Sequence, residues 1–193
     1  MSAPGKSAPG RIRIIGGQLR NSRLEVADLP GLRPTAERVR ETLFNWLAPV
    51  IEGMRCLDLC AGTGALGIEA LSRGAAAVEF VERNASAAQA LRANLARLKA
   101  AGGHVVVTDA GSFLQQAGRP HELVFLDPPF ALELWSSLAG QLEQGGWLAA
   151  PAWIYVESPH GSLPTLPANW QLHREGQAGE VRFALYRRAL PLS

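Results

Sequence analysis

The residues best suited to chemistry are Asp127, Pro128, Pro129 and Phe130, which follow the apolar segment 122–126. A residue that precedes a proline is restricted to extended geometry, so two successive prolines stiffen the chain and fix the direction of the Asp127 side chain. The Asp127 carboxylate and the Pro128 carbonyl can together accept the two N–H bonds of an amino group on a nucleobase. Phe130 offers a flat ring against which an unstacked base can rest.

Such an arrangement suits methylation of an exocyclic amine. The nitrogen of an aromatic amine is a poor nucleophile, because its lone pair is delocalised into the ring. Accepting both N–H bonds raises its electron density and aims it at a methyl donor, and orientation of this kind supplies much of a reaction's acceleration. Asp127 need not remove a proton first, since the methylated amine loses one readily. The base must leave its stack to reach the site.

A second candidate site is the glycine-rich segment 57–67, in which Gly62, Gly64 and Gly67 follow a short apolar strand. The spacing matches G-x-G-x-x-G, and Glu82 stands twenty residues after Gly62, where an acidic residue would bind ribose hydroxyls. Sites for NAD and for S-adenosyl-L-methionine share these features, so the flanking residues must distinguish the two.

Two observations favour the methyl donor. Asp58 lies inside the strand before the loop, where dinucleotide sites usually have an apolar residue, and its carboxylate can hold the loop or accept from an ammonium group. The donor has no phosphate, so close approach of the backbone matters more than a helix dipole. For Asp109, contact with adenine and capping of a helix remain equal alternatives. The residues predicted to bind the donor are Asp58, Ala61, Gly62, Thr63, Gly64, Glu82, Asp109 and Ala110.

The elements that would position both sites alternate along the chain after residue 55. Apolar stretches predict strands and the segments between them predict helices, so the chain is α/β, with a parallel sheet covered by helices on both faces. Ligands bind beyond the carboxyl ends of such strands, so Asp127 should emerge beside the glycine loop. This position argues against the alternative that Pro128 and Pro129 only terminate a strand. The predicted strands are 56–59, 78–81, 104–108, 122–126 and 153–157, the helices are 65–73, 85–100, 111–116 and 132–144, and 170–174 with 180–188 form an antiparallel hairpin.

The first forty residues are basic. They hold eight Lys or Arg against three Asp or Glu, whereas the other 153 residues hold eleven against fourteen. Segments 11–15 and 23–26 alternate basic and apolar residues and predict a short hairpin, and Thr35 predicts the N-cap of a helix over 36–48. A basic extension is typical of RNA binding, with a solvated, disordered N-terminus as the alternative. The predicted RNA contacts are Arg11, Arg13, Arg20, Arg23, Arg33, Arg38 and Arg40, and the chain divides into a tail (1–10), an RNA-binding arm (11–34) and a catalytic domain (35–193).

Composition sets the remaining limits. The 193 residues are 47% hydrophobic and 19% charged, which predicts one globular domain, and no segment has the apolar length of a membrane helix. Cys56 and Cys60 predict reduced thiols in a cytoplasmic protein, and four histidines without ligand spacing predict no metal site. Cys60 lies in the glycine loop and is interpreted as a small apolar filler. Glu157, at the end of the last parallel strand, receives no role.

The sequence resembles the bacterial small-subunit (16S) ribosomal RNA guanine-N2 methyltransferases over nearly the whole chain after residue 10. The stretch 38–47 is highly specific to that family, and segments 13–18, 30–35, 58–64, 127–130 and 155–158 also carry the resemblance. Cys60 and Thr63 depart from the family's usual Phe and Ser, and Asn21-Ser22 replaces a more Gly-rich or basic pair.

The resemblance implies a class I methyltransferase fold, which is Rossmann-like, with a seven-stranded, mostly parallel sheet and S-adenosyl-L-methionine as donor. It implies methylation of one guanine of small-subunit rRNA, in a 30S subunit or an assembly intermediate, and we expect a monomer. From the residues alone, three alternatives stay open: an adenine-N6 methyltransferase acting on RNA or DNA, a non-catalytic RNA-binding assembly factor, and an NAD-dependent oxidoreductase.

Overall fold

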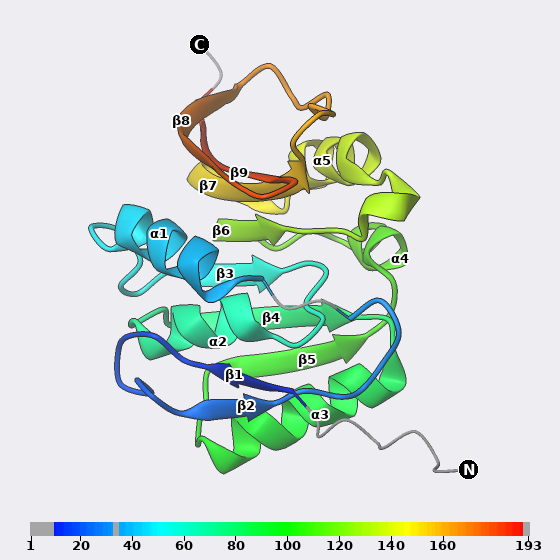
Figure 1. Cartoon of the computed structure of the whole chain (residues 1–193). Helices are drawn as coiled ribbons and strands as arrows, with labels where there is room; N and C mark the ends of the chain where they lie inside the picture. The colour runs from blue at the N-terminus through cyan, green and yellow to red at the C-terminus, as the bar shows by residue number, and fades with distance from the viewer. Residues whose placement is uncertain (1–9, 33–34, 191–193) are drawn as a thin grey trace.

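A seven-stranded sheet forms the centre of the computed structural model, which describes residues 10–32 and 35–190 (Figure 1). Its strand order is β5-β4-β3-β6-β7-β9-β8. Neighbours from β5 to β7 are parallel, whereas β9 is antiparallel to both β7 and β8. The predicted sheet and its C-terminal hairpin are therefore confirmed. The strands are β3 Arg55–Asp58, β4 Ala77–Glu82, β5 Gly103–Val107, β6 His121–Leu126, β7 Leu148–Pro159, β8 Trp170–Ala178 and β9 Val181–Arg188.

Helices cover both faces of this sheet, and each face has its own apolar core. Successive side chains of a strand point to opposite faces. In β6, Leu123 and Phe125 accordingly pack in one core, and Val124 and Leu126 in the other. The first core also receives α1 (Glu37–Leu47), α2 (Ala65–Ser72) and α3 (Ala85–Arg97), and the second receives α4 (Ala110–Leu114) and α5 (Trp135–Gln144).

Element boundaries differ from the predictions where tertiary contacts or left-handed backbone intervene. The helix predicted over 132–144 begins only at Trp135, because a 3₁₀ turn, η1 (Phe130–Leu132), and Glu133 at φ +48° come first. β7 is longer than the predicted 153–157, since it pairs with β9 over 152–159. No helix in the described part of the chain is long and apolar enough to cross a membrane.

The predicted N-terminal hairpin is present as β1 (Arg11–Arg13) and β2 (Arg23–Glu25), which pair antiparallel. It packs on two helices of the sheet domain. The Glu69 carboxylate of α2 accepts hydrogen bonds from the Ile15 and Gly16 amides, and Asn94 of α3 exchanges two with the main chain of Glu25. Residues 11–26 are thus hydrogen-bonded to the body. Apart from Gly10, the tail predicted at 1–10 lies outside the described residues.

Candidate active site

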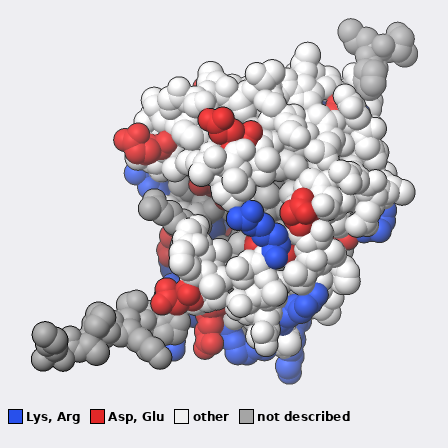
Figure 2. Space-filling model, turned by 90° about the vertical axis from the view of Figure 1, so that its right-hand side faces the viewer, with Lys and Arg blue, Asp and Glu red and all other residues white. Residues whose placement is uncertain are grey.

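The parallel strands end at one edge of the sheet, on the right in Figure 1, and both predicted sites lie there. Figure 2 looks onto this edge and shows side chains of both charges scattered among uncharged ones. In open α/β sheets the ligand crevice lies outside the carboxyl ends of the strands. The residues that follow β3, β4, β6 and β7 therefore decide the chemistry.

The glycine loop joins β3 to α2 through a turn that requires glycine. Gly62 and Gly64 have φ values of +56° and +77°, and a Cβ at Gly64 would overlap the Leu91 side chain. Asp58 is 2% exposed, and its Oδ2 accepts from the Gly67 amide at 3.1 Å. Burial raises the pKa of Asp58 to about 7. Asp58 therefore holds the glycine loop against α2, which is one of the two roles predicted for it. Contact of Asp58 with the ammonium group of a donor stays a prediction.

Glu82 connects the end of β4 to the same loop. Its Oε2 accepts from the Gly62 amide at 2.7 Å and its Oε1 from the Asn84 amide at 2.9 Å. Each carboxylate oxygen keeps a second lone pair, so Glu82 can still accept two hydroxyl groups. The neighbouring Ala61 amide donates to the Val81 carbonyl at 2.9 Å, and Thr63 Oγ1 accepts from the Ala65 amide.

Asp109 and Ala110 stand where α4 begins. Asp109 is the N-cap: its Oδ1 accepts from the Ser112 amide at 2.9 Å and its Oδ2 from the Ser112 hydroxyl at 2.7 Å. These bonds lower the pKa of the exposed Asp109 carboxyl. The capping alternative is therefore confirmed, and contact of Asp109 or Ala110 with an adenine group stays a prediction.

Asp127 follows β6 and faces the glycine loop from the next strand of the sheet. Burial raises the pKa of Asp127, and the Glu157 carboxylate raises it further. Only Asp127 Oδ2 has a neighbouring donor among the described residues, the Thr35 hydroxyl at 3.5 Å. No described residue donates to Oδ1 or to the Pro128 carbonyl. These two acceptors belong to consecutive residues, and neither has a donor in the described part of the chain.

Phe130 lies in the 3₁₀ turn after the two prolines and is 36% exposed, so it is no core residue. Its ring centroid lies 5.7 Å from that of Trp135, with the planes at 50°. Trp135 is buried at the start of α5 and fixes one side of the Phe130 ring. The exposed part of the ring agrees with the predicted stacking surface for a base.

Three further residues of this site escaped the sequence interpretation of catalysis. The Tyr155 hydroxyl donates to Glu157 Oε2 at 2.9 Å, and Thr35 Oγ1 lies 3.4 Å from the same oxygen. Thr35 is not the N-cap of α1, which is Ala36 without a side-chain bond. The signal available for Glu157 was its place at the carboxyl end of β7, beside the strand that carries Asp127.

The structure corrects one predicted RNA contact. Arg40 is 2% exposed, donates to the carbonyls of Arg13 and Thr35, and lies 3.6 Å from the buried Glu69 carboxylate. Burial lowers the pKa of Arg40, and its guanidinium is bonded to groups inside the protein, so it does not face RNA. Arg13 is half-exposed and paired with Glu37. Arg33 lies outside the described residues, and Arg11, Arg20, Arg23 and Arg38 are exposed.

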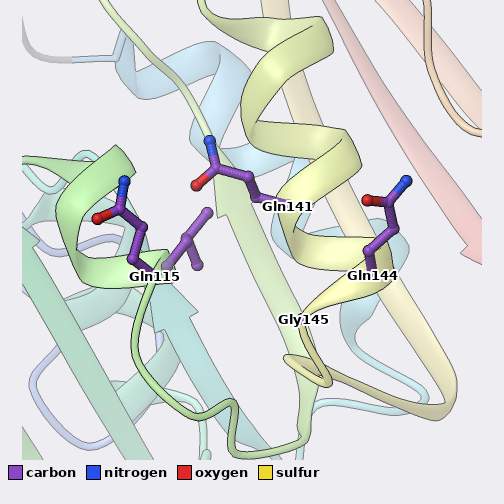
Figure 3. A pocket seen from close by; sticks show the side chains of 5 residues that line it. Gln115, Gln141, Gln144 and Gly145 are labelled. Atoms are coloured by element: carbon purple, nitrogen blue, oxygen red, sulfur yellow. The ribbon is translucent and has the colours of Figure 1, made fainter.

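Other features of the described chain carry no site. Burial raises the pKa of both Cys56 and Cys60 strongly, which leaves the thiols unreactive at neutral pH. Within residues 10–32 and 35–190 no three His, Cys, Asp or Glu side chains gather as metal ligands would. A hollow of about 390 Å³ lies between α4 and α5, and Figure 3 shows the glutamines along it. It includes no predicted site residue; its lining is Leu114, Gln115, Gln141, Gln144 and Gly145.

Comparison with known proteins agrees with this geometry. A family model described as Conserved hypothetical protein 95 matches residues 12–187. Ribosomal RNA small subunit methyltransferase D of Escherichia coli K12 is 56% identical over 97% of this chain and 96% of its own length. The protein of the same name from Haemophilus influenzae is 43% identical over 94% and 96% of the two chains. A solved structure described as a putative methyltransferase from Escherichia coli superimposes with a TM-score of 0.88, at 54% identity, covering 94% of this chain and 99% of that chain.

The glycine loop, the acidic end of β4 and the Asp-Pro-Pro-Phe segment all lie at one edge of a sheet with the class I methyltransferase topology. The family match spans most of the chain, and the relatives match it almost from end to end. The chain therefore belongs to the Conserved hypothetical protein 95 family, together with the proteins named ribosomal RNA small subunit methyltransferase D.

Proposed function

We propose that the protein transfers a methyl group from S-adenosyl-L-methionine to the exocyclic N2 amino group of a guanine in small-subunit (16S) ribosomal RNA. The observation that carries the proposal is the pair of acceptors, Asp127 Oδ1 and the Pro128 carbonyl, which have no donor among the described residues. Two acceptors side by side match the two N–H bonds of an exocyclic amine. Family membership supports the coarser statement, methylation of small-subunit rRNA, because the relatives carry that activity in their names.

The residues at the ends of β3 and β4 fit the proposed donor. Gly62 adopts a positive φ and has no Cβ of its own to hinder a ligand, and Glu82 has lone pairs left for two ribose hydroxyls. Asp58 and Glu82 both brace the loop through main-chain amides, so its shape does not depend on a ligand. When bound, the donor supplies an electrophilic methyl carbon. Asp109 and Ala110 complete the proposed contacts at the end of β5.

Asp127 and Pro128 act on the acceptor. Accepting both N–H bonds increases electron density on the guanine N2 nitrogen and directs its lone pair across the strand ends toward the glycine loop. The nitrogen would form the new N–C bond as the bond between that carbon and the donor's sulfur breaks, which leaves S-adenosyl-L-homocysteine. The methylated amine, now acidic, then releases one proton to water. Phe130 supports the face of the flipped base. The chemistry is positioning and electrostatics, and it needs no metal at the described residues.

The exposed arginines of the hairpin are the proposed grip on RNA. Arg11, Arg20 and Arg23 lie on the arm, and Arg38 at the start of α1 is exposed too. Guanidinium groups bind phosphates in a salt-dependent manner and place the RNA without reading its sequence. The proposed partner is rRNA within a 30S subunit or an assembly intermediate, bound by a monomer of this protein.

The test compares modified nucleosides in small-subunit rRNA from cells with and without the protein. Loss of one N2-methylguanosine, restored by the unmutated chain and not by Asp127→Ala, is the expected result. Loss of N6-methyladenosine instead would transfer the proposal to adenine. An unchanged nucleoside profile in cells that lack the protein would reject methylation of this rRNA altogether.

A further inference from the structure

Glu157 is a buried carboxylate held in place from two directions. The residue is 9% exposed at the end of β7, and the Trp135 indole N–H donates to its main-chain carbonyl at 2.8 Å. The Tyr155 hydroxyl donates to its Oε2 at 2.9 Å. Among the residues that the structure describes, no Lys or Arg forms an ion pair with it. Burying a carboxylate without a cation costs free energy, so a carboxylate kept in this position points to a ligand that donates hydrogen bonds.

Glu157 and Asp127 face the same space. The Thr35 hydroxyl lies 3.5 Å from Asp127 Oδ2 and 3.4 Å from Glu157 Oε2, so one small group bridges the two carboxyls. The other oxygens, Asp127 Oδ1 and Glu157 Oε1, have no donor in the described part of the chain. The two carboxyls that meet at the Thr35 hydroxyl therefore each keep one oxygen available as an acceptor for a ligand. Burial raises the pKa of both carboxyls, and the charge of Glu157 raises the pKa of Asp127 further. A ligand with two adjacent donors would relieve the repulsion at Asp127.

Guanine is the base that has two such donors. Its N1–H lies next to its N2 amino group, so two carboxylates can accept along one edge. Adenine has a lone pair at N1 beside its N6 amino group, and a carboxylate facing that lone pair is repelled. A site that excludes the wrong base in this way gains specificity from the repulsive contact as well as from the attractive one.

We propose that Glu157 is the residue that selects guanine, by accepting the N1–H bond of the base through Oε1 while Asp127 and Pro128 hold the N2 amino group. Tyr155 acts as a positioning residue, because its hydroxyl occupies Oε2 and leaves Oε1 to the base. Thr35 keeps the two carboxyls apart at a fixed separation. This assignment rests on the proposed guanine-N2 function and adds a residue that determines specificity.

The decisive variant is Glu157→Gln. The buried Tyr155 hydroxyl has no other acceptor among the described residues, so it favours the amide oxygen on its own side, and the amide NH₂ takes the place of Oε1. The site then has a donor where guanine N1–H needs an acceptor. 2-Aminopurine keeps the amino group at C2 and has a lone pair at N1, so it is the complementary base for this variant.

The measurement is single-turnover methylation of small-subunit rRNA whose target nucleotide, located by the nucleoside comparison, is either guanine or 2-aminopurine. The unmutated protein should favour guanine by roughly 10- to 100-fold, the effect of one mismatched buried hydrogen bond. Glu157→Gln should slow guanine methylation by a similar factor and reduce or reverse that preference. 2-Aminopurine also lacks O6, but this loss affects both proteins equally, so the change in preference reports on N1.

Two controls isolate the role of Glu157. Glu175→Gln, an exposed carboxylate on β8 paired with Arg182, should leave both rates unchanged. Tyr155→Phe added to Glu157→Gln frees the amide to rotate and should restore part of the guanine preference. Donor binding by calorimetry confirms that each variant is folded.

An equal fall in both rates, with the guanine preference unchanged, would show that Glu157 only supports the fold, and it would overturn the assignment while leaving the proposed function intact. Failure of the unmutated protein to methylate the guanine substrate would instead count against the proposed function.

Discussion

The two halves of the proposed site differ in how far their polar groups are satisfied within the chain. On the donor half, Asp58 and Glu82 both accept from amides of the glycine loop or its helix. On the acceptor half, Asp127 and Glu157 share the Thr35 hydroxyl at the long end of hydrogen-bonding distance, and Glu157 accepts from the Tyr155 hydroxyl as well. Main-chain amides hold both carboxylates of the donor half, whereas no main-chain amide of the described residues donates to Asp127 or Glu157.

This difference in hydrogen bonding indicates which carboxylates stabilise the fold as well as bind a ligand. A carboxylate that braces a loop loses both roles when it is removed, so its variants mix stability with affinity. A buried carboxylate with few donors contributes little to the fold, because its burial costs free energy, and the charge of Glu157 beside Asp127 adds to that cost. We therefore expect variants of the acceptor half to lose activity but not stability, and variants of the glycine loop to lose both.

The largest effect should come from Asp127→Ala. Removing the carboxylate takes away one of the two acceptors of the amine and should reduce the methylation rate by roughly 10²- to 10³-fold, as for other groups that stabilise a reacting centre. Donor affinity and the free energy of unfolding should stay near their original values. Single-turnover kinetics, calorimetry and urea unfolding measure the three quantities. A large loss of stability would break the distinction between the two halves.

Gly64→Ala tests the opposite half. Its φ of +77° is unfavourable for a residue with a Cβ, and that atom would overlap Leu91 of α3. Together these should lower the free energy of unfolding by about 1–3 kcal/mol, which urea unfolding resolves. Gly140→Ala serves as the matched control, because the same added Cβ meets no atom within 4 Å. Equal unfolding midpoints for the two variants would contradict the strained turn.

An effect of similar size is expected of Glu82→Ala, measured as donor affinity. The carboxylate should contribute hydrogen bonds to the ribose, and the loss should cost about 1–3 kcal/mol of binding. Calorimetry with S-adenosyl-L-methionine measures the change. Because Glu82 also accepts the Gly62 and Asn84 amides, the free energy of unfolding should fall as well. Binding of NADH in place of the methyl donor would reject the proposed cofactor.

The sequence predicted what depends on local pattern. The continuous apolar run Leu123–Leu126 indicated a buried strand, and its side chains pack on both faces of the sheet. The glycine spacing with Glu82 located the loop whose Gly62 amide donates to Glu82. Asp-Pro-Pro-Phe identified the acceptor loop because the prolines constrain the chain locally. In each case the signal lies within a few residues of the feature that it predicts.

The roles of Thr35 and Arg40 depend on contacts between segments far apart in the chain or on different helices, which a local sequence pattern does not indicate. Thr35 carried the local signal of an N-cap, yet its contacts are with residues 92 and 122 positions away. Arg40 had the appearance of a surface charge, but the partner that accounts for its burial, Glu69, is on another helix. A single sequence contains no record of either pairing, so both became visible only in the folded chain.

The smallest expected effect is on the salt dependence of RNA binding, and it distinguishes the exposed arginines of the hairpin from the buried Arg40. Point variants are needed because the arm is hydrogen-bonded to α2 and α3. Arg23→Ala removes an exposed guanidinium from β2. If Arg23 contacts a phosphate, the slope of log affinity against log salt for rRNA binding should flatten by roughly one unit. Stability should hardly change.

Arg40→Ala is the matched control, because it removes a buried arginine in place of an exposed one. It leaves the Glu69 carboxylate in the core without its full set of partners, so it should lower the free energy of unfolding by about 3–5 kcal/mol, with no change of salt slope in the fraction that remains folded. Filter binding between 50 and 200 mM salt, where about 10³- to 10⁵-fold changes are typical of proteins with several phosphate contacts, has the range to resolve one unit. An unaltered slope for Arg23→Ala, and likewise for Arg11→Ala and Arg20→Ala, would remove the hairpin from the RNA-binding surface. Among the predicted contacts that the structure describes, Arg38 would then be the next exposed arginine to test.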